Sequence, residues 1–573
     1  MDVGKNRYLP ALLAVIMTVL NSTKPVVVDD TAYLMFARHL ATNPLQPYDF
    51  ALFWYSAPQP AMEVLLPPVL PYWLACGINL LSEHLLLLKL WLFPFAWLFC
   101  ESAAFLLRRF ARRTTRDGIV LLAFSSAVLP LFNFMLDVPA VALGLASVAC
   151  LIRGCENQRV RWLILSGIAA ALAAQTKYTM ISLPAVLLWY GFTHRKAWQV
   201  SVAIATGLSL FVAWEFYVTQ VCGESHFLHH LHAQQPIGGD LSFSETLQNW
   251  WSEKSELAKP MVGYLGGLAV VSGLYAGRAL GFPRWVVIGT AIITALGLVA
   301  VCVTPYSESL LLRNAQTGTP RLQLSELVFN SLGTAVVVTI LLTCFALLVR
   351  RRKWKVSLRI NRMTWFLVGW LAIEVGAYFV LTPFPAARRV MMIAILFSFI
   401  ASRLVSRVRR VKPNQWVVIY GVVFGCTIFA LDCWDAWPER QLAYRASATI
   451  GERGQHQVWT QGHWGWQYYT DRLGMKLVHP GHTLIHRGDW LVVPLIPNED
   501  EGFYRPDSGR PKFVMKWAVL EPIGEHVWDD PLHYQTVPTL YGGTVPILGR
   551  DHPRLRVGVY RVTQDWTPQP LPK

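Results

Sequence analysis

The sequence has little charge for its length. Asp, Glu, Lys and Arg make up 15% of the 573 residues, whereas soluble domains carry about 25%. Hydrophobic residues account for 54%, and the mean hydropathy is +0.36. An ordinary soluble globular protein is therefore excluded. The net charge of +16 does not indicate a nucleic-acid partner either. Such binding needs basic residues gathered on an exposed charged surface, and here they are diluted in apolar sequence.

Cysteine and an excess of basic residues are both missing from the C-terminal part of the chain. All nine cysteines lie at or before Cys433, so no disulfide framework can hold the residues that follow. Residues 432–573 contain 15 basic and 16 acidic residues, whereas residues 1–431 contain 36 and 19. This contrast predicts a membrane domain over residues 1–431 and a soluble domain over residues 432–573.

Long apolar runs, by contrast, fill the first part. Thirteen stretches approach the ~20 residues that a membrane-spanning helix needs. They are centred near residues 16, 96, 126, 145, 169, 187, 209, 269, 294, 339, 373, 398 and 423. The first run, about Tyr8 to Leu20, has no small-residue cleavage site and is expected to remain as an anchor.

The predicted fold class is therefore an α-helical polytopic membrane protein with a small C-terminal α/β domain. In that domain the apolar runs indicate a mixture of strands and one helix. The strands are expected at 457–460, 490–496, 513–519 and 556–562, and the helix at 465–474.

The placement of Lys and Arg predicts the orientation. If the N-terminus is cytoplasmic, the short cytoplasmic connections hold 26 of the 36 basic residues in residues 1–431. Cytoplasmic loops of membrane proteins carry such an excess. An odd number of spans then places residues 432–573 outside, together with a long first outer loop at 22–84.

Two adjacent acids, Asp29 and Asp30, directly follow the first predicted span. An amphipathic helix is expected next, because apolar residues between Tyr33 and Leu40 recur at helical spacing. The acids can serve simply as the helix N-cap. They can also form a base, because one carboxylate raises the proton affinity of its neighbour.

Two further outer segments attract attention. PPVLPYW, residues 67–73, includes Tyr72 and is broken by prolines, which disfavour a straight span. It is expected to lie at the membrane interface, where it can be a plain anchor. Asp137 lies in FNFMLDVPAVALGL, at the outer end of the third predicted span. An acid at a membrane face can also be there without a function.

Three cations are expected on the outer side, against the general charge bias. Lys177 lies in AAQTKYTMISLPA, and Arg388 and Arg389 lie in TPFPAARRVMM. A lone lysine can extend its ammonium group to the interface. An arginine pair at the outer interface suits a phosphate.

Together these segments resemble the GT-C glycosyltransferases. The nearest families are the lipid A aminoarabinose transferases, the protein O-mannosyltransferases and the glycosyltransferases of lipopolysaccharide cores. The resemblance rests on the Asp29-Asp30 pair, PPVLPYW, LDVPAVAL, QTKYTMISLPA and PFPAARRVMM. Relatives often carry Glu-Lys before the two prolines, where this chain has Leu65-Leu66, with Glu63 two residues earlier. They also have Tyr where Arg389 stands.

The resemblance implies transfer of a hexosyl or pentosyl group from a polyprenyl-phosphate donor to a lipid, glycan or protein acceptor. It implies that Asp29, Asp30 and Asp137 are catalytic, and that Lys177, Arg388 and Arg389 bind the donor phosphate. The expected location is a bacterial inner membrane, with the site and the C-terminal domain facing the periplasm. No nucleic acid is expected as a partner.

Histidines cluster in HFLHHLH, from His226 to His232. His226, His229 and His230 can share a helix face and hold a metal. They can instead contact substrate, with Glu63 and Tyr72, or belong to a solvated loop. No cofactor is required by the sequence, and a divalent cation is left open. The aromatic segment GHWGWQYYTDRLG, 462–474, can bind sugar or form the core of its domain.

A transporter or flippase of a lipid-linked or polar solute is the alternative. A transporter should place charged residues near the middle of the bilayer. Here the conspicuous charges lie at one membrane face, beside a long loop and a soluble domain. These features favour the glycosyltransferase.

Overall fold

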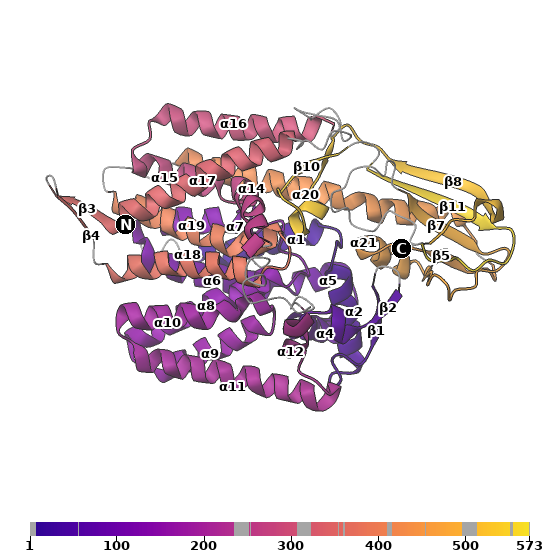
Figure 1. The fold of residues 1–573 in the computed structure, drawn as a ribbon, viewed down its shortest axis with the longest axis horizontal. Coiled ribbons are helices and arrows are strands. Elements are labelled where there is room, and N and C mark those ends of the chain that lie inside the picture. Colours follow the sequence, from indigo (N-terminus) through magenta and orange to yellow (C-terminus); the bar gives the residue numbers. More distant parts are fainter. Residues whose placement is uncertain are drawn as a thin grey trace.

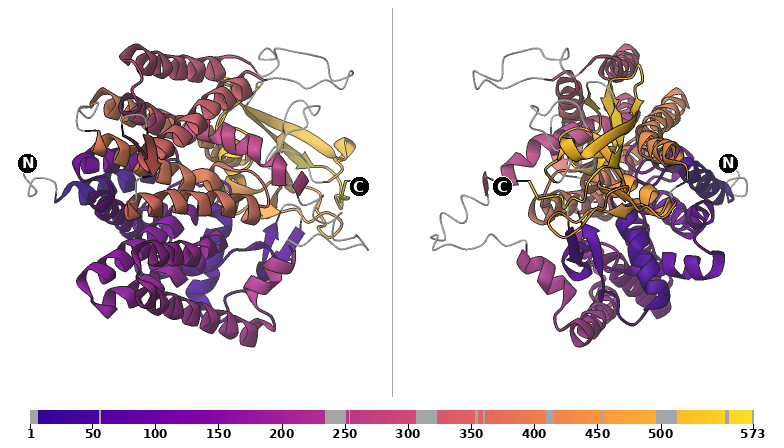
Figure 2. Two further views of the ribbon diagram at one scale, coloured as in Figure 1. Left: turned by 60° about the vertical axis from the view of Figure 1, so that its left-hand side comes forward. Right: turned by 90° about the vertical axis from the view of Figure 1, so that its right-hand side faces the viewer.

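Helices dominate the molecule, and a small sheet lies over one end of them (Figure 1). Two further views show the same arrangement from other sides (Figure 2). The computed structural model describes the chain outside the following residues: 1–6, 55–56, 234–250, 253, 306–322, 353–354, 359–360, 409–414, 453, 496–512, 551–553 and 572–573.

Eight helical segments of the described chain are long and apolar enough to cross a membrane. A ninth candidate, Lys254–Leu268 with Val270–Leu280, is bent by 75°. The eight are α5–α6 (Leu85–Phe110), α8 (Asp137–Asn157), α11 (Ala197–Cys222), α16 (Arg284–Val303), α17 (Leu324–Leu348), α18 (Arg362–Leu381), α19 (Ala387–Arg407) and α20 (Gln415–Ile450). The buried α8 and α19 form the centre of the bundle.

Shorter helices occupy three more of the predicted spans. They are α1 (Leu9–Thr23), α9 (Val160–Ala174) and α10 (Leu183–His194). The bent candidate contains α14 (Ala258–Leu268) and α15 (Val270–Leu280). Twelve of the thirteen predicted centres thus lie within a helix or at the break between two helices of the described chain.

The span predicted near residue 126 is wrong as a full-length helix. There α7 covers only Thr115–Ala123, nine residues, and a buried, turn-rich segment follows as far as Leu136. Pro130 lies within this segment, and a proline in a helix interior removes a backbone donor and clashes with the preceding turn. This segment is apolar because it is buried inside the protein, and it does not form a helix that crosses lipid.

The first predicted outer loop folds against the end of the bundle that carries the sheet. It contains α2 (Asp30–Thr42), the hairpin β1 (Ala51–Trp54) and β2 (Ala57–Pro60), α3 (Ala61–Val64) and α4 (Val69–Leu81). The expected amphipathic helix is confirmed as α2, whose apolar face is buried. The proline-broken segment begins α4, which packs against α2.

The opposite end of the bundle carries the hairpin of β3 (Val349–Arg352) and β4 (Lys355–Leu358) (Figure 1). This hairpin belongs to one of the basic connections that the charge bias assigns to the cytoplasm. The basic connection and the first outer loop therefore lie at opposite ends, as the alternation of spans predicts.

The C-terminal sheet has five strands in the order β6-β5-β7-β11-β8. The strands are β5 (Val458–Thr460), β6 (Lys476–Leu477), β7 (Trp490–Leu495), β8 (Leu520–Trp528) and β11 (Leu555–Val562). α21 (Trp464–Arg472) follows β5, and α12 (His226–Ala233), α22 (Val537–Tyr541), β9 (Tyr534–Gln535) and β10 (Leu548–Gly549) complete the described elements near this end. The predicted helix and three of the four predicted strands are confirmed.

The strand predicted at 513–519 is wrong. Phe513 makes one isolated bridge, Trp517–Val519 is a 3-10 turn, and β8 begins only at Leu520. The predicted domain boundary at residues 431 and 432 falls inside α20, which runs through it as one helix. The division into two domains stays a prediction.

Candidate active site

The acidic pair lies on a strained turn between α1 and α2. Val28 has a φ of +46°, a region that a β-branched residue rarely adopts. Such a conformation costs on the order of 1–3 kcal/mol and persists only where the surroundings hold it. Neither carboxylate caps α2 through its side chain, so the simple capping interpretation does not describe this pair.

Asp30 is fully buried behind the turn. Its carboxylate accepts a hydrogen bond from the Val27 N–H at 3.0 Å and another from the Asn133 amide. Burial raises the pKa of Asp30 to about 7, and the nearby Lys89 charge opposes this rise. Asp30 therefore has no open path to a substrate.

Asp29 faces the other way and is partly open. Its carboxylate accepts a hydrogen bond from Arg388 at 2.9 Å, with side-chain exposures of 19% for Asp29 and 10% for Arg388. Arg388 is the second residue of α19, so this pair joins segments 359 residues apart. Arg389 follows it, with its guanidinium 4.5 Å from the centre of the Phe384 ring.

A second acid and base form a buried ion pair. Asp137 is the first residue of α8, and Lys177 precedes the short turn Tyr178–Ser182. The two side chains pair directly, and both are buried. Burial lowers the pKa of Lys177 to about 8, although the Asp137 carboxylate opposes this effect.

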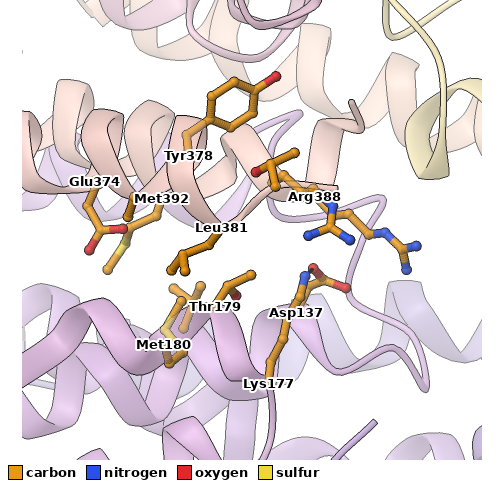
Figure 3. A pocket seen from close by; sticks show the side chains of 13 residues that line it. Asp137, Lys177, Thr179, Met180, Glu374, Tyr378, Leu381, Arg388 and Met392 are labelled. Carbon is orange, nitrogen blue, oxygen red and sulfur yellow. Dashed lines mark hydrogen bonds and ion pairs between the residues drawn. The ribbon is translucent and has the colours of Figure 1, made fainter. Parts of the chain in front are cut away.

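These charged groups line one cleft (Figure 3). Lys177, just after α9, and Asp137, at the start of α8, point toward one another, and Arg388 faces them from α19. Arg389 also lines the cleft. The sequence-predicted Asp137, Lys177, Arg388 and Arg389 are thus brought together, and Asp29 joins them through its ion pair with Arg388.

Several lining residues were not assigned a role from the sequence. They include Thr179, Met180, Glu374, Tyr378 and Thr382. Glu374 lies at the other end of the cleft from Arg388 (Figure 3), and its carboxylate accepts a hydrogen bond from Trp370 at 3.2 Å. An acid inside a predicted span was the one available signal. The others are ordinary residues on helix faces that the fold turns inward.

Asp29 also borders a second, narrow crevice. Its walls come from the first outer loop and from α21, and they include Trp54, His463, Trp464 and Gln467. His463 Nδ1 lies 3.0 Å from Gln467 Oε1, and the His463 ring meets Trp54 edge to face. The aromatic segment predicted to bind sugar or form a core thus contributes a wall beside Asp29.

The predicted histidines His226, His229 and His230 line neither the cleft nor the crevice. His226 is buried, lies 3.1 Å from the Leu65 carbonyl through Nε2, and therefore accepts the Tyr178 hydroxyl at Nδ1, 2.6 Å away. Burial lowers its pKa well below the usual value. His230 contacts His226, whereas His229 pairs with Glu224. Within the described residues no group of three or more His, Cys, Asp and Glu side chains could hold a metal.

The remaining two predicted residues also lie elsewhere. Glu63 is exposed on α3 and lines neither space. Tyr72 donates its hydroxyl to the Pro44 carbonyl at 2.6 Å and meets Trp214 edge to face. Both contacts of Tyr72 tie α4 to its neighbours.

The fold and this site define a class: a polytopic membrane protein with acids and cations gathered at one end of its helices. Residues 66–216 match the family model described as dolichyl-phosphate-mannose-protein mannosyltransferase. No curated protein matches the sequence.

Solved structures also resemble the chain. One is ArnT from Cupriavidus metallidurans bound to undecaprenyl phosphate, with 13% identity over 86% of this chain and 93% of that one, and a TM-score of 0.39. Another is the archaeal oligosaccharyltransferase AglB from Archaeoglobus fulgidus in complex with an inhibitory peptide and a dolichol-phosphate. It has 11% identity over 82% of this chain and 64% of that one, and a TM-score of 0.44.

The family match over residues 66–216 agrees with the resemblance of the motifs that lie within it. The chain is an integral multi-pass membrane protein, and its residues 66–216 are similar to a family described as transferring mannose from a lipid-linked donor. No comparison supports the transporter alternative.

Proposed function

We propose that the cleft binds the phosphate of a polyprenyl-phosphate sugar and that Asp29 activates the acceptor beside it. The observation that carries this proposal is the charge balance. Lys177, Arg388 and Arg389 face two carboxylates, Asp29 and Asp137. At the Arg388 end of the cleft, three cations against these two anions leave one positive charge in a largely buried place, while Glu374 lies at the other end (Figure 3). The phosphodiester of such a donor carries one negative charge.

The two arginines have donors to spare. Their Nε atoms are buried without a hydrogen-bond partner among the residues that the structure describes. A buried donor without a partner costs free energy, and a phosphate oxygen would remove that cost. Lys177 adds a point charge opposite them, and Asp137 keeps its ammonium group in the cleft.

Asp29 lines the narrow crevice and pairs with Arg388 of the cleft. This position suits a general base, because the base must reach both the acceptor and the donor. In the proposed reaction an acceptor hydroxyl enters from the crevice, and its oxygen forms a bond to the anomeric carbon. The bond between that carbon and the phosphate oxygen breaks. Asp29 takes the hydroxyl proton, and the cations stabilise the charge on the departing lipid phosphate.

Asp30 is proposed to hold the turn in place and not to contact the substrate. It is fully buried and bound to the Val27 N–H and the Asn133 amide. These contacts hold the start of α2, on which Asp29 depends for its direction.

The proposed orientation places this site on the outer face of a bacterial inner membrane, in contact with the periplasm. The concentration of basic residues in the connections at the other end supports it. The acceptor is proposed to be a lipid, glycan or protein hydroxyl, and the transferred group a hexose or a pentose.

The test compares two Asp→Asn variants of the purified enzyme in lipid nanodiscs. Asp29→Asn should abolish transfer from polyprenyl-phosphate sugars, a loss of roughly 10²–10⁴-fold or more. Asp49→Asn, an exposed acid in the same loop, is the matched control and should keep full activity. The measurement is the rate at which radiolabelled sugar appears on the acceptor at a saturating concentration of the donor. Full activity of Asp29→Asn would overturn the assignment of the base.

A further inference from the structure

α21 lies directly against the turn that carries Asp29, although more than 430 residues of chain separate them. The Val26 N–H donates to the Tyr469 hydroxyl at 2.9 Å. The Thr31 hydroxyl donates to the Trp464 carbonyl at 2.7 Å. Both bonds are buried, and they flank Asp29 on its two sides in the sequence.

The backbone is strained on both sides of this contact. Val28 has a φ of +46°, and Trp464, the first residue of α21, has a φ of +62°. Neither is glycine, and both line the crevice at Asp29. Strained residues of this kind persist only where surrounding contacts hold them. Release of Val28 toward an ordinary φ would turn the next residue, Asp29.

The approach of α21 is also unusually close. A Cβ atom at Gly465 would lie 2.5 Å from the Val26 carbonyl oxygen and 2.3 Å from Glu439 Oε2. Only glycine fits there without displacement of the helix or the turn. The contact therefore depends on a residue with no side chain, placed at the start of α21.

We propose that α21 positions Asp29 for catalysis, with Tyr469 and the Trp464 carbonyl as its two attachment points. This inference rests on the proposed role of Asp29 as the base. Tyr469 and Trp464 are positioning residues, because they act through the turn. The C-terminal segment thereby forms part of the active site, and the aromatic run that begins α21 has a function beyond packing.

The test uses substitutions that remove one hydrogen bond each. Tyr469→Phe keeps the ring and loses the hydroxyl that accepts the Val26 N–H, and Thr31→Val loses the hydroxyl that donates to Trp464. Each should lower kcat roughly ten- to a hundredfold, since a small misplacement of a catalytic group has an effect of this size. The KM for the polyprenyl-phosphate sugar should stay within about twofold.

Two controls separate positioning from stability. Tyr468→Phe removes a hydroxyl that is bonded to Arg472 within α21 and should leave kcat unchanged. Thr31→Ser keeps the hydroxyl, so its kcat should be much closer to that of the parent enzyme than the kcat of Thr31→Val. Thermal unfolding of each variant is followed in the same nanodiscs.

The outcomes distinguish this inference from the proposed function. If Asp29→Asn is inactive while Tyr469→Phe and Thr31→Val keep full kcat, the positioning inference is wrong and the base assignment stands. If Asp29→Asn is fully active, the base assignment fails first. If Tyr468→Phe loses as much kcat as Tyr469→Phe, any disturbance of α21 lowers the activity, and the hydrogen bond to the Asp29 turn has no special part in it. That result would overturn the inference.

Discussion

Asp29 and Asp30 are neighbours in the chain but meet opposite surroundings. Asp30 is sealed behind the turn by the Val27 N–H and Asn133, whereas Asp29 keeps partial exposure beside Arg388. Both residues follow Val28, whose positive φ lies in the same turn. A general base must reach the proton that it removes, and only Asp29 meets this condition.

Lys177 gives the site a pH dependence. Burial lowers its pKa to about 8 from 10.5, with Asp137 in opposition. The ammonium charge is therefore present below about pH 8 and is lost as the pH rises through this value. We expect the KM for the polyprenyl-phosphate donor to increase above about pH 8, measured by initial rates between pH 6.5 and 9.5.

The control for this prediction is Lys177→Arg, since a guanidinium stays charged over the whole range. This variant should show no increase of KM between pH 7 and 9.5. An unchanged rise in the variant would mean that another group titrates.

At the scale of elements, the charged residues gather where helices begin. Asp30 opens α2, Asp137 opens α8, and Arg388 lies in the first turn of α19. Free backbone amides and the positive end of the helix dipole are found at such starts. The starts of α8 and α19, whose residues line the cleft, thus add to the positive potential that the side chains supply there.

The close packing of α21 makes a prediction at this scale. Gly465→Ala must displace the helix from Val26, because the new methyl group would lie 2.5 Å from the Val26 oxygen. Activity should fall at least tenfold, measured as kcat. Gly289→Ala, in α16 with nothing within 4 Å of the new Cβ, should leave kcat unchanged. Equal activity of the two variants would contradict the close contact.

At the scale of the whole molecule, a buried ion pair joins the start of the first outer loop to α20. Lys24, directly after α1, pairs with Asp432 in α20, and both are fully buried. Its ammonium group also donates to the Pro130 carbonyl at 2.8 Å and to the Tyr541 hydroxyl in α22 at 3.2 Å. This one side chain therefore connects the first outer loop with the C-terminal part.

Removal of one partner should be costly for this reason. Lys24→Met leaves Asp432 buried without its cation, and such a change costs about 3–5 kcal/mol. We expect a clear fall of the unfolding temperature, followed by intrinsic Trp fluorescence in nanodiscs. The double variant Lys24→Met with Asp432→Leu should regain much of the lost stability. A single variant as stable as the parent would show that the pair contributes nothing.

Composition and periodicity predicted much of this architecture. Apolar length located most helices, and alternation located three strands, because both patterns depend on local burial. The third predicted span failed, since burial inside a protein and burial in lipid select the same apolar residues. The predicted strand at 513–519 failed as well: Phe513 and Val519 are buried without a strand between them, whereas Val514 and Trp517 are exposed.

The sequence by itself determined the class of molecule and named the charged residues, because motif order and charge bias are local properties of the chain. Only the tertiary structure decided which residues meet. It paired Asp29 with Arg388 and Asp137 with Lys177, left Glu63 and Tyr72 outside the cleft, and brought α21 against the Asp29 turn. These outcomes depend on how helices far apart in the chain pack. A buried charge needs its partner in space, and spacing along the sequence does not record that distance.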